Sequence, residues 1–283
     1  MRIANLAGRL VLVDATGTSA VDVATASTGR FDPHPQAAYA RWDELAAFAA
    51  TLDPAADGKP FAVADLAAPV PAPRQVFAIG LNYRDHAAES GFEPPAEPVV
   101  FTKFPSCITG PTGDVALPPG GHTDWEVELV AVIGRRAHHV PLEQGWSHVA
   151  GLTIGQDISE RITQFNAHPP QFALGKSFPG FGPIGPWVVG VDEFADPDDI
   201  ALECDVNGEQ VQKGRTRDLV FTVPELIHRL SAILPLDPGD VIFTGTPAGV
   251  GMGRDPQRFL ADGDELVTRI DGIGELRHRF VAG

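Results

Sequence analysis

The sequence DWEVELVAVIG, residues 124–134, joins acidic residues to an apolar run that has the length and β-branched content of a strand. Side chains two residues apart on a strand point to the same face, so Glu126 and Glu128 would project side by side, with Asp124 on that face as well. Carboxylates grouped beside an apolar run repel one another strongly if nothing compensates their charge. The segment therefore predicts either a bound cation or exposure to solvent.

A divalent cation would compensate this charge. Oxygen ligands without cysteine or histidine favour Mg²⁺, Mn²⁺ or Ca²⁺ over Zn²⁺. Asp157 is the candidate for a third acidic ligand, because it ends the apolar run 151–156 and opens a polar turn. Alternatively, Glu126 and Glu128 form the wet face of an amphipathic edge strand, and this pattern alone does not separate the two interpretations.

The rest of the chain is dominated by short apolar runs between glycine and proline turns, which predict strands. These runs are 76–79, 98–101, 126–133, 151–156, 187–191, 201–206, 240–244 and 265–270. Helical patterns beyond residue 70 are few and lie at 84–90, 159–166 and 222–234. In the last of these, Thr222 is a plausible N-cap and Pro224 lies in the first turn. Many short strands with few helices indicate a mixed, β-dominated barrel or sandwich.

The N-terminal part differs in composition. Apolar spacing near 3.6 residues and many alanines predict a helix at 37–52. Residues 53–73 are rich in proline, alanine and aspartate, which indicates a linker or an irregular crossing segment. We therefore expect a small N-terminal domain at residues 1–70 and a larger domain at residues 71–283.

Composition excludes several classes of protein. The 283 residues carry 37 Asp and Glu against 21 Lys and Arg, a formal charge of −16, which argues against nucleic-acid binding. We expect no membrane span and no secretory signal, because the apolar runs are too short or are broken by charges. Two cysteines are too few for a disulfide framework. We expect a soluble, cytoplasmic protein.

Five motifs in this order resemble the fumarylacetoacetate hydrolase family, over about residues 74–283. They are GLNYRDHAAE (80–89), DWEVEL (124–129), GQDISER (155–161), GKSF (175–178) and TGTPAGVG (244–251). The resemblance implies an α+β, β-dominated fold, a mixed β-sandwich roll with a small N-terminal domain, and a homodimer. It also implies a Mg²⁺ or Mn²⁺ site made by Glu126, Glu128 and Asp157.

Three residues are the candidates for catalysis. His86 suits the activation of water, because a free imidazole titrates near neutral pH, at roughly 6.5. Glu89 follows three residues later and would share a helical face with His86, where it could orient the ring. Lys176 could hold a substrate carboxylate or stabilise a developing oxyanion. Lys103 is a weaker candidate of the same kind.

Substrate contacts are expected from four further residues. Thr246 offers a hydroxyl and an N–H group within the glycine-rich motif. By the resemblance, Asn82, Tyr83 and Gln164 also reach the substrate. The sequence departs from the family at Ile162, where many members carry an aspartate after the arginine, so the role of that acid does not transfer.

The resemblance implies a metal-dependent hydrolase that cleaves a C–C bond in an acylpyruvate or fumarylacetoacetate-like β-diketo acid, in aromatic catabolism. The small-molecule partner would be a 2-oxo acid or β-diketone held on the metal. A decarboxylase or isomerase of 2-oxo diacids is the alternative within enzymes, and hydrolysis is favoured because His86 and Glu89 are both present. An inert metal-binding β-sandwich is the alternative of another class, and it predicts an incomplete set of acidic ligands.

Overall fold

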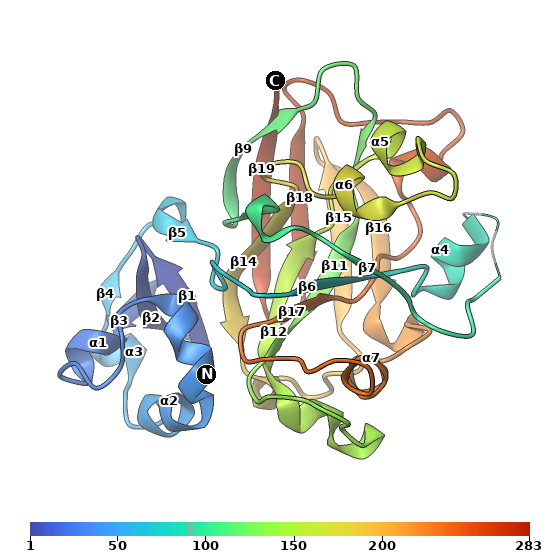
Figure 1. Ribbon diagram of the computed structural model, residues 1–283. Helices are drawn as coiled ribbons and strands as arrows, with labels where there is room; N and C mark the ends of the chain where they lie inside the picture. Colours follow the sequence, from blue (N-terminus) through green and yellow to red (C-terminus); the bar gives the residue numbers. More distant parts are fainter. Residues whose placement is uncertain (90, 92) are drawn as a thin grey trace.

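The computed structural model describes residues 1–89, 91 and 93–283, and most of its strands belong to two sheets (Figure 1). The larger sheet has the order β4-β3-β2-β1-β14-β12-β11-β17-β6-β7. Its strands are β1 (Arg2–Leu6), β2 (Arg9–Val13), β3 (Ser19–Asp22), β4 (Lys59–Pro60), β6 (Val76–Gly80), β7 (Val99–Thr102), β11 (Val127–Ile133), β12 (Val149–Gln156), β14 (Gly182–Val189) and β17 (Val241–Phe243). Short strands β5 (Leu66–Ala67) and β8 (Ile108–Thr109) pair with β1 and β14.

The second sheet packs against one face of the larger sheet. Its order is β16-β15-β18-β19-β9, formed by β9 (Thr112–Leu117), β15 (Ala201–Val206), β16 (Glu209–Arg215), β18 (Glu265–Ile270) and β19 (Gly274–Ala282). β11 contacts β15 and β14 contacts β19, so Leu129 and Ile154 of the first sheet share one core with Leu202 and Leu266 of the second. This confirms the β-dominated sandwich.

β11 lies in the middle of the larger sheet. It pairs with β12 on one side and with β17 on the other, and every residue in it is buried. Leu129 faces the core between the sheets, whereas Val130 and Val132 face a second core on the opposite side. Glu128 shares the face of Val130, since side chains alternate along a strand. The edge-strand interpretation of the acidic motif is therefore wrong.

The N-terminal strands extend the larger sheet, because β1 pairs with β14. Residues 53–73 are not a free linker: they contain α3 (Pro54–Asp57), and within them β4 and β5 pair with β3 and β1. The predicted helix at 37–52 is a 3₁₀ helix, η1 (Pro35–Arg41), followed by α2 (Trp42–Ala49). The domain division at residue 70 stays a prediction.

The remaining helices are short. They are α1 (Val23–Ala26), α4 (Arg84–Glu89), α5 (Arg161–Phe165), α6 (Phe172–Gly175) and α7 (Val223–Ser231), with 3₁₀ turns η2 (Val63–Asp65), η3 (Pro105–Cys107), η4 (Leu142–His148), η5 (Val191–Glu193), η6 (Thr216–Asp218) and η7 (Gly251–Gly253). The predicted extension of α4 to Ser90 lies outside the described residues. α7 has Pro224 in its first turn as predicted, but the Thr222 side chain makes no capping hydrogen bond. Among the residues that the structure describes, no helix has the length and apolar character needed to cross a membrane.

Candidate active site

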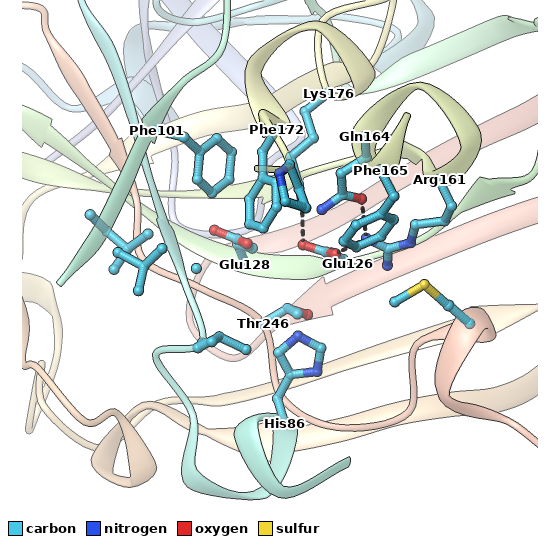
Figure 2. Close-up of a pocket in the computed structure, with 16 residues that line it drawn as sticks. His86, Phe101, Glu126, Glu128, Arg161, Gln164, Phe165, Phe172, Lys176 and Thr246 are labelled. Carbon is cyan, nitrogen blue, oxygen red and sulfur yellow. Dashed lines mark hydrogen bonds and ion pairs between the residues drawn. The ribbon is translucent and has the colours of Figure 1, made fainter. Parts of the chain in front are cut away.

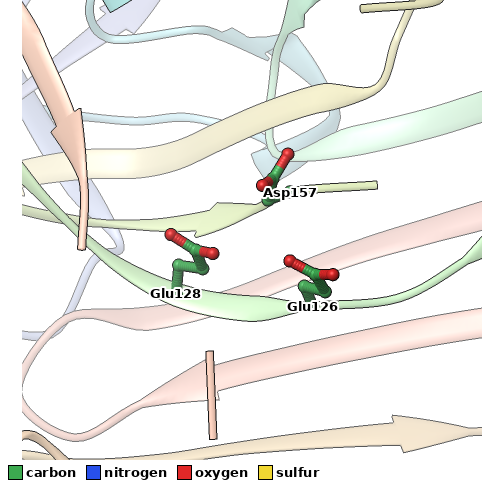
Figure 3. A group of neighbouring side chains, drawn as sticks. All are labelled: Glu126, Glu128 and Asp157. Atoms are coloured by element: carbon green, nitrogen blue, oxygen red, sulfur yellow. The ribbon is translucent and has the colours of Figure 1, made fainter. Parts of the chain in front are cut away.

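Three buried carboxylates meet where β11 begins and β12 ends (Figure 3). Val127 pairs with Gln156, and the Asp157 N–H group donates to the Glu126 carbonyl at 2.9 Å, so the two strands carry these residues together. One carboxylate oxygen from each of Glu126, Glu128 and Asp157 lies within 4.8 Å of the others. This set of oxygen donors fits a hard divalent cation.

Asp124 does not join this group, contrary to the expectation that it shares the face of Glu126. It lies on β10 (Thr123–Asp124), which pairs with β13 (Ser159–Glu160). Its Oδ2 accepts hydrogen bonds from Arg161 Nε at 2.9 Å and Nη2 at 2.7 Å, and from the Met252 N–H group at 3.0 Å. Asp124 therefore fixes a buried arginine and the neighbouring loop.

Three buried cations surround the carboxylates. Lys176 Nζ lies 2.8 Å from Glu126 Oε2 and 2.7 Å from Asp157 Oδ2, so one ammonium bridges two acids. Lys103 Nζ lies 2.6 Å from Asp157 Oδ1 and also donates to the Lys176 carbonyl. Arg161 Nη1 lies 2.8 Å from Glu126 Oε1. The space between Glu126 and Asp157 thus already accommodates positive charge.

The three cations pair with Glu126, Asp157 and Asp124, so they do not compensate the negative charge of Glu128. Glu128 Oε2 accepts a hydrogen bond from the Gly245 N–H group at 2.8 Å, and none of the ion pairs among the described residues includes it. Burial and the neighbouring Asp157 and Glu126 raise the pKa of Glu128 well above its usual value. A bound divalent cation would compensate this charge.

In Glu126 and Lys176, unlike in Glu128, the effect of charged neighbours on the pKa outweighs the effect of burial. Burial opposes ionisation of Glu126, but Lys176 and Arg161 outweigh it and hold the pKa of Glu126 at about 2. Burial likewise opposes the charge of Lys176, but Asp157 and Glu126 raise the pKa of its ammonium. The neighbours of these two groups therefore favour the charged form of both.

The glycine-rich motif after β17 holds protein carboxylates with its backbone. Its N–H groups at Gly245, Gly249 and Gly251 donate to Glu128, Glu89 and Asp124 at 2.8, 3.0 and 2.6 Å. Gly245 has a φ of +103°, and a Cβ there would lie 2.7 Å from the Asn82 Cβ, so only glycine fits. These N–H groups therefore position the acidic residues of the site.

His86 and Glu89 form a pair on one face of α4, as predicted. His86 Nδ1 lies 3.1 Å from Glu89 Oε2, while the other oxygen of Glu89 accepts from Gly249. His86 is 8 % exposed and lines the same cavity as Glu126 and Glu128. Glu89 can therefore orient the imidazole, whose second nitrogen is left for chemistry in the cavity.

A cavity of about 520 Å³ opens in front of the carboxylates (Figure 2). Its lining includes six of the predicted site residues, namely His86, Glu126, Glu128, Gln164, Lys176 and Thr246. α5 carries Gln164 to the cavity, and Lys176 directly follows α6. The two helices pack so closely that a Cβ added to Gly175 would lie 2.7 Å from the backbone nitrogen of Gln164. With Arg161, which also lines it, the cavity joins residues from all five motifs.

Asn82 and Tyr83 lie outside this lining. The Asn82 amide donates to the carbonyls of Phe221 and Thr244 at 3.0 and 2.7 Å, and its oxygen accepts from the Phe221 N–H group at 2.8 Å. Its polar atoms are therefore occupied by the scaffold. Tyr83 is 2 % exposed, and burial raises the pKa of its hydroxyl. The geometry favours a supporting role for both residues over the predicted contact with substrate.

Sequence reasoning missed the parts played by Arg161 and Asp124, and it underrated Lys103. Arg161 lines the cavity and also donates to Gln164 Oε1 at 2.9 Å. Lys103 is fully buried against Asp157. For Lys103 the sequence does offer a signal, because lysine is scarce: the chain holds Lys59, Lys103, Lys176 and Lys213 only.

Replacing Asp124 with alanine is expected to destabilise the fold by about 3–5 kcal/mol, because Arg161 would stay buried without its main partner. The backbone N–H groups of Gly251 and Met252 would lose their acceptor as well. Urea denaturation followed by circular dichroism measures the change. Asp43→Ala, which removes the exposed partner of Arg135, is the control and should change stability little. Equal effects of the two substitutions would contradict a structural role for Asp124.

Comparison with known proteins identifies relatives of this chain. Residues 75–281 match the family described as fumarylacetoacetate (FAA) hydrolase C-terminal. The human mitochondrial oxaloacetate tautomerase FAHD2A is 44% identical over 215 residues, which cover 76% of this chain and 68% of the human protein. A Mycobacterium smegmatis structure, solved as a candidate HpcE protein, is 53% identical with a TM-score of 0.93, and the match covers 100% of both chains.

A further solved structure contains a metal ion. The maleylpyruvate hydrolase from Sphingobium sp. SYK-6, in complex with manganese (II) ion and pyruvate, is 30% identical with a TM-score of 0.81. That match also covers 100% of both chains. Because the family match spans most of the sequence and the relatives align over most of their length, the chain belongs to the fumarylacetoacetate hydrolase family.

Proposed function

We propose that this protein is a divalent-metal-dependent hydrolase that cleaves a C–C bond in an acylpyruvate-like β-diketo acid. The observation that carries the proposal is the His86–Glu89 pair on the same cavity as the buried carboxylates. The manganese and pyruvate in the related maleylpyruvate hydrolase support both the metal and the 2-oxo acid product. The metal would be Mg²⁺ or Mn²⁺, and both are hard cations that suit three carboxylates.

Glu126, Glu128 and Asp157 would hold this ion. When bound there, it would act as a Lewis acid toward the carboxylate and 2-oxo group of the substrate. Lys176 lies against two of the three acids, so its ammonium is placed to pair with the substrate carboxylate at that end of the cavity. Arg161 stays on Asp124, which is outside the metal ligands.

His86 would act as the general base for the attacking water. It accepts a proton from the water, whose oxygen adds to the acyl carbonyl, and Glu89 stabilises the resulting imidazolium. The bond between the acyl carbon and the pyruvate methylene then breaks, and its electron pair passes to the pyruvate fragment. The imidazolium of His86 returns its proton to that fragment, which gives pyruvate, and the acyl fragment leaves as a carboxylic acid.

The test is the release of pyruvate from acetylpyruvate and longer acylpyruvates, followed with lactate dehydrogenase. We expect release with Mn²⁺ or Mg²⁺, its loss after EDTA treatment and dialysis, and its recovery when the ion is restored. Absence of pyruvate release from every acylpyruvate with both metals would refute the proposed hydrolase.

A second candidate function is the keto–enol tautomerisation of a 2-oxo diacid such as oxaloacetate. The 44% identity to the human oxaloacetate tautomerase favours it. Tautomerisation requires a proton to move between carbon and oxygen without consuming water. The loss of the enol absorbance of oxaloacetate, with no pyruvate formed, would identify this activity in the same protein.

A further inference from the structure

Outside its charged centre, the cavity has an apolar lining. This part of the wall is formed by Ile79, Leu81, Val99, Phe101, Phe165, Pro170, Phe172 and Met252. Phe172 of α6 meets Phe101 of β7 edge to face, with ring centroids 5.5 Å apart at 72°, and meets Phe165 of α5 at 5.9 Å and 70°. Three elements therefore build one aromatic surface beside the carboxylates (Figure 2).

The cationic side chains of the lining already form ion pairs with acidic residues. Lys176 pairs with Glu126 and Asp157, and a metal ion that took over those acids would leave its ammonium at the 2-oxo acid end of the cavity. Arg161 donates two N–H groups to Asp124, which is not a metal ligand, and its Nη1 lies 2.8 Å from Glu126 Oε1, so its guanidinium is held at the carboxylate end of the cavity. Ser90 and Phe92, outside the described residues, bring no cationic side chain.

The uncharged polar side chains of the lining are each held by a protein partner through their oxygen. Gln164 Oε1 accepts from Arg161, and Thr246 Oγ1 accepts from Gln212 Nε2 at 2.8 Å. His86, the remaining basic side chain of the lining, pairs with Glu89, so every basic group among the described lining residues has an acidic partner. A second carboxylate at the far end of a substrate would lose its hydration with no ion pair in exchange, whereas an apolar group would gain contact with the aromatic surface.

We propose that this cavity selects 2-oxo acids whose substituent is an apolar alkyl or aryl group, and that it discriminates against those that end in a second carboxylate. The inference rests on the proposed function and specifies its substrate class as aliphatic or aromatic acylpyruvates. A cavity of about 520 Å³ also has room for such a group beyond the 2-oxo acid.

Binding of two ligands of equal shape tests this without turnover. 5-Methyl-2-oxohexanoate has the shape of 2-oxoglutarate, with an isopropyl group in place of the distal carboxylate. By calorimetry on the Mn²⁺-loaded protein, we expect it to bind at least about 10-fold more tightly than 2-oxoglutarate. Equal affinity, tighter binding of 2-oxoglutarate, or no binding of either ligand would overturn the proposal. If the preference holds but no acylpyruvate is cleaved, only the proposed hydrolysis fails.

Variants test whether the aromatic surface causes the preference for the apolar ligand. Phe165 is 38% exposed, so Phe165→Arg introduces a cation at the cavity with a low risk to the fold, and it should shift the affinity ratio at least about 10-fold toward 2-oxoglutarate. Met252→Lys tests the same point from η7 should the first variant fail to fold. Phe104→Arg is the matched control, because Phe104 is 47% exposed and lies outside the lining. An equal shift in this control would contradict the assignment.

Discussion

Glu128→Gln is expected to lower the affinity for Mn²⁺ by about 100-fold or more and to abolish metal-dependent turnover. Residues that merely support a metal ligand cost about 10–100-fold when replaced, and loss of a ligand charge should reach at least the upper figure. Glu128 is the informative choice, because its carboxyl has no cationic partner among the described residues. Glu126→Gln would instead remove one of the two acidic partners of both Lys176 and Arg161. Calorimetric titration with Mn²⁺ measures the affinity.

Thermal unfolding separates a metal ligand from a structural residue. The folded state raises the pKa of Glu128 above 4.5, so the metal-free protein loses stability as the pH rises above that value. Glutamine carries no proton to lose, and the metal-free variant at pH 8 should be at least as stable as the parent. Added Mn²⁺ should raise the melting temperature of the parent and of the control Glu203→Gln, whose partly exposed carboxylate pairs with Arg269 of the second sheet, but not that of Glu128→Gln. A destabilised metal-free variant would contradict the assignment.

The acidic motif and the order of the short strands allowed the fold class and the metal-site hypothesis to be predicted from sequence. β11 was predictable because its run is both apolar and β-branched. β16, with the sequence EQVQKGR, was missed because polar residues dominate it, although the Asn207-Gly208 turn that joins it to β15, with φ values of 53° and 79°, is a local hairpin signal. The pairing of β9 with β19 joins segments that lie far apart in the chain, and it leaves no local pattern in the sequence.

The same limit applies to the site. The alternation of side chains along a strand correctly predicted that Glu126 and Glu128 lie together. It also predicted that Asp124 joins them, because the sequence does not show the break between β10 and β11. The use of backbone N–H groups to hold Glu128 and Glu89 depends on the fold of a distant loop. The homodimer and the cytoplasmic location rest on the resemblance and on composition, and both stay predictions.

His86→Ala should reduce acylpyruvate hydrolysis by about 10²–10⁴-fold, the usual cost of losing a general base. Mn²⁺ affinity should stay within about twofold of the parent value, because no hydrogen bond joins His86 to the three carboxylates. Glu89→Gln should cost less, since the amide oxygen can still accept from Gly249 while the imidazolium loses its negative partner. Steady-state kinetics with calorimetry on each variant gives both quantities.

Imidazole in the buffer distinguishes a lost base from a disturbed fold. The cavity left by His86→Ala lies beside the substrate site, so added imidazole should restore part of the hydrolysis in that variant and none in Glu128→Gln, which lacks a metal ligand. Hydrolysis at the parent rate in His86→Ala would show that water is activated elsewhere. Since tautomerisation consumes no water, an unchanged rate of enol loss from oxaloacetate in the same variant, together with absent hydrolysis in the parent, would make tautomerisation the better assignment of this metal site.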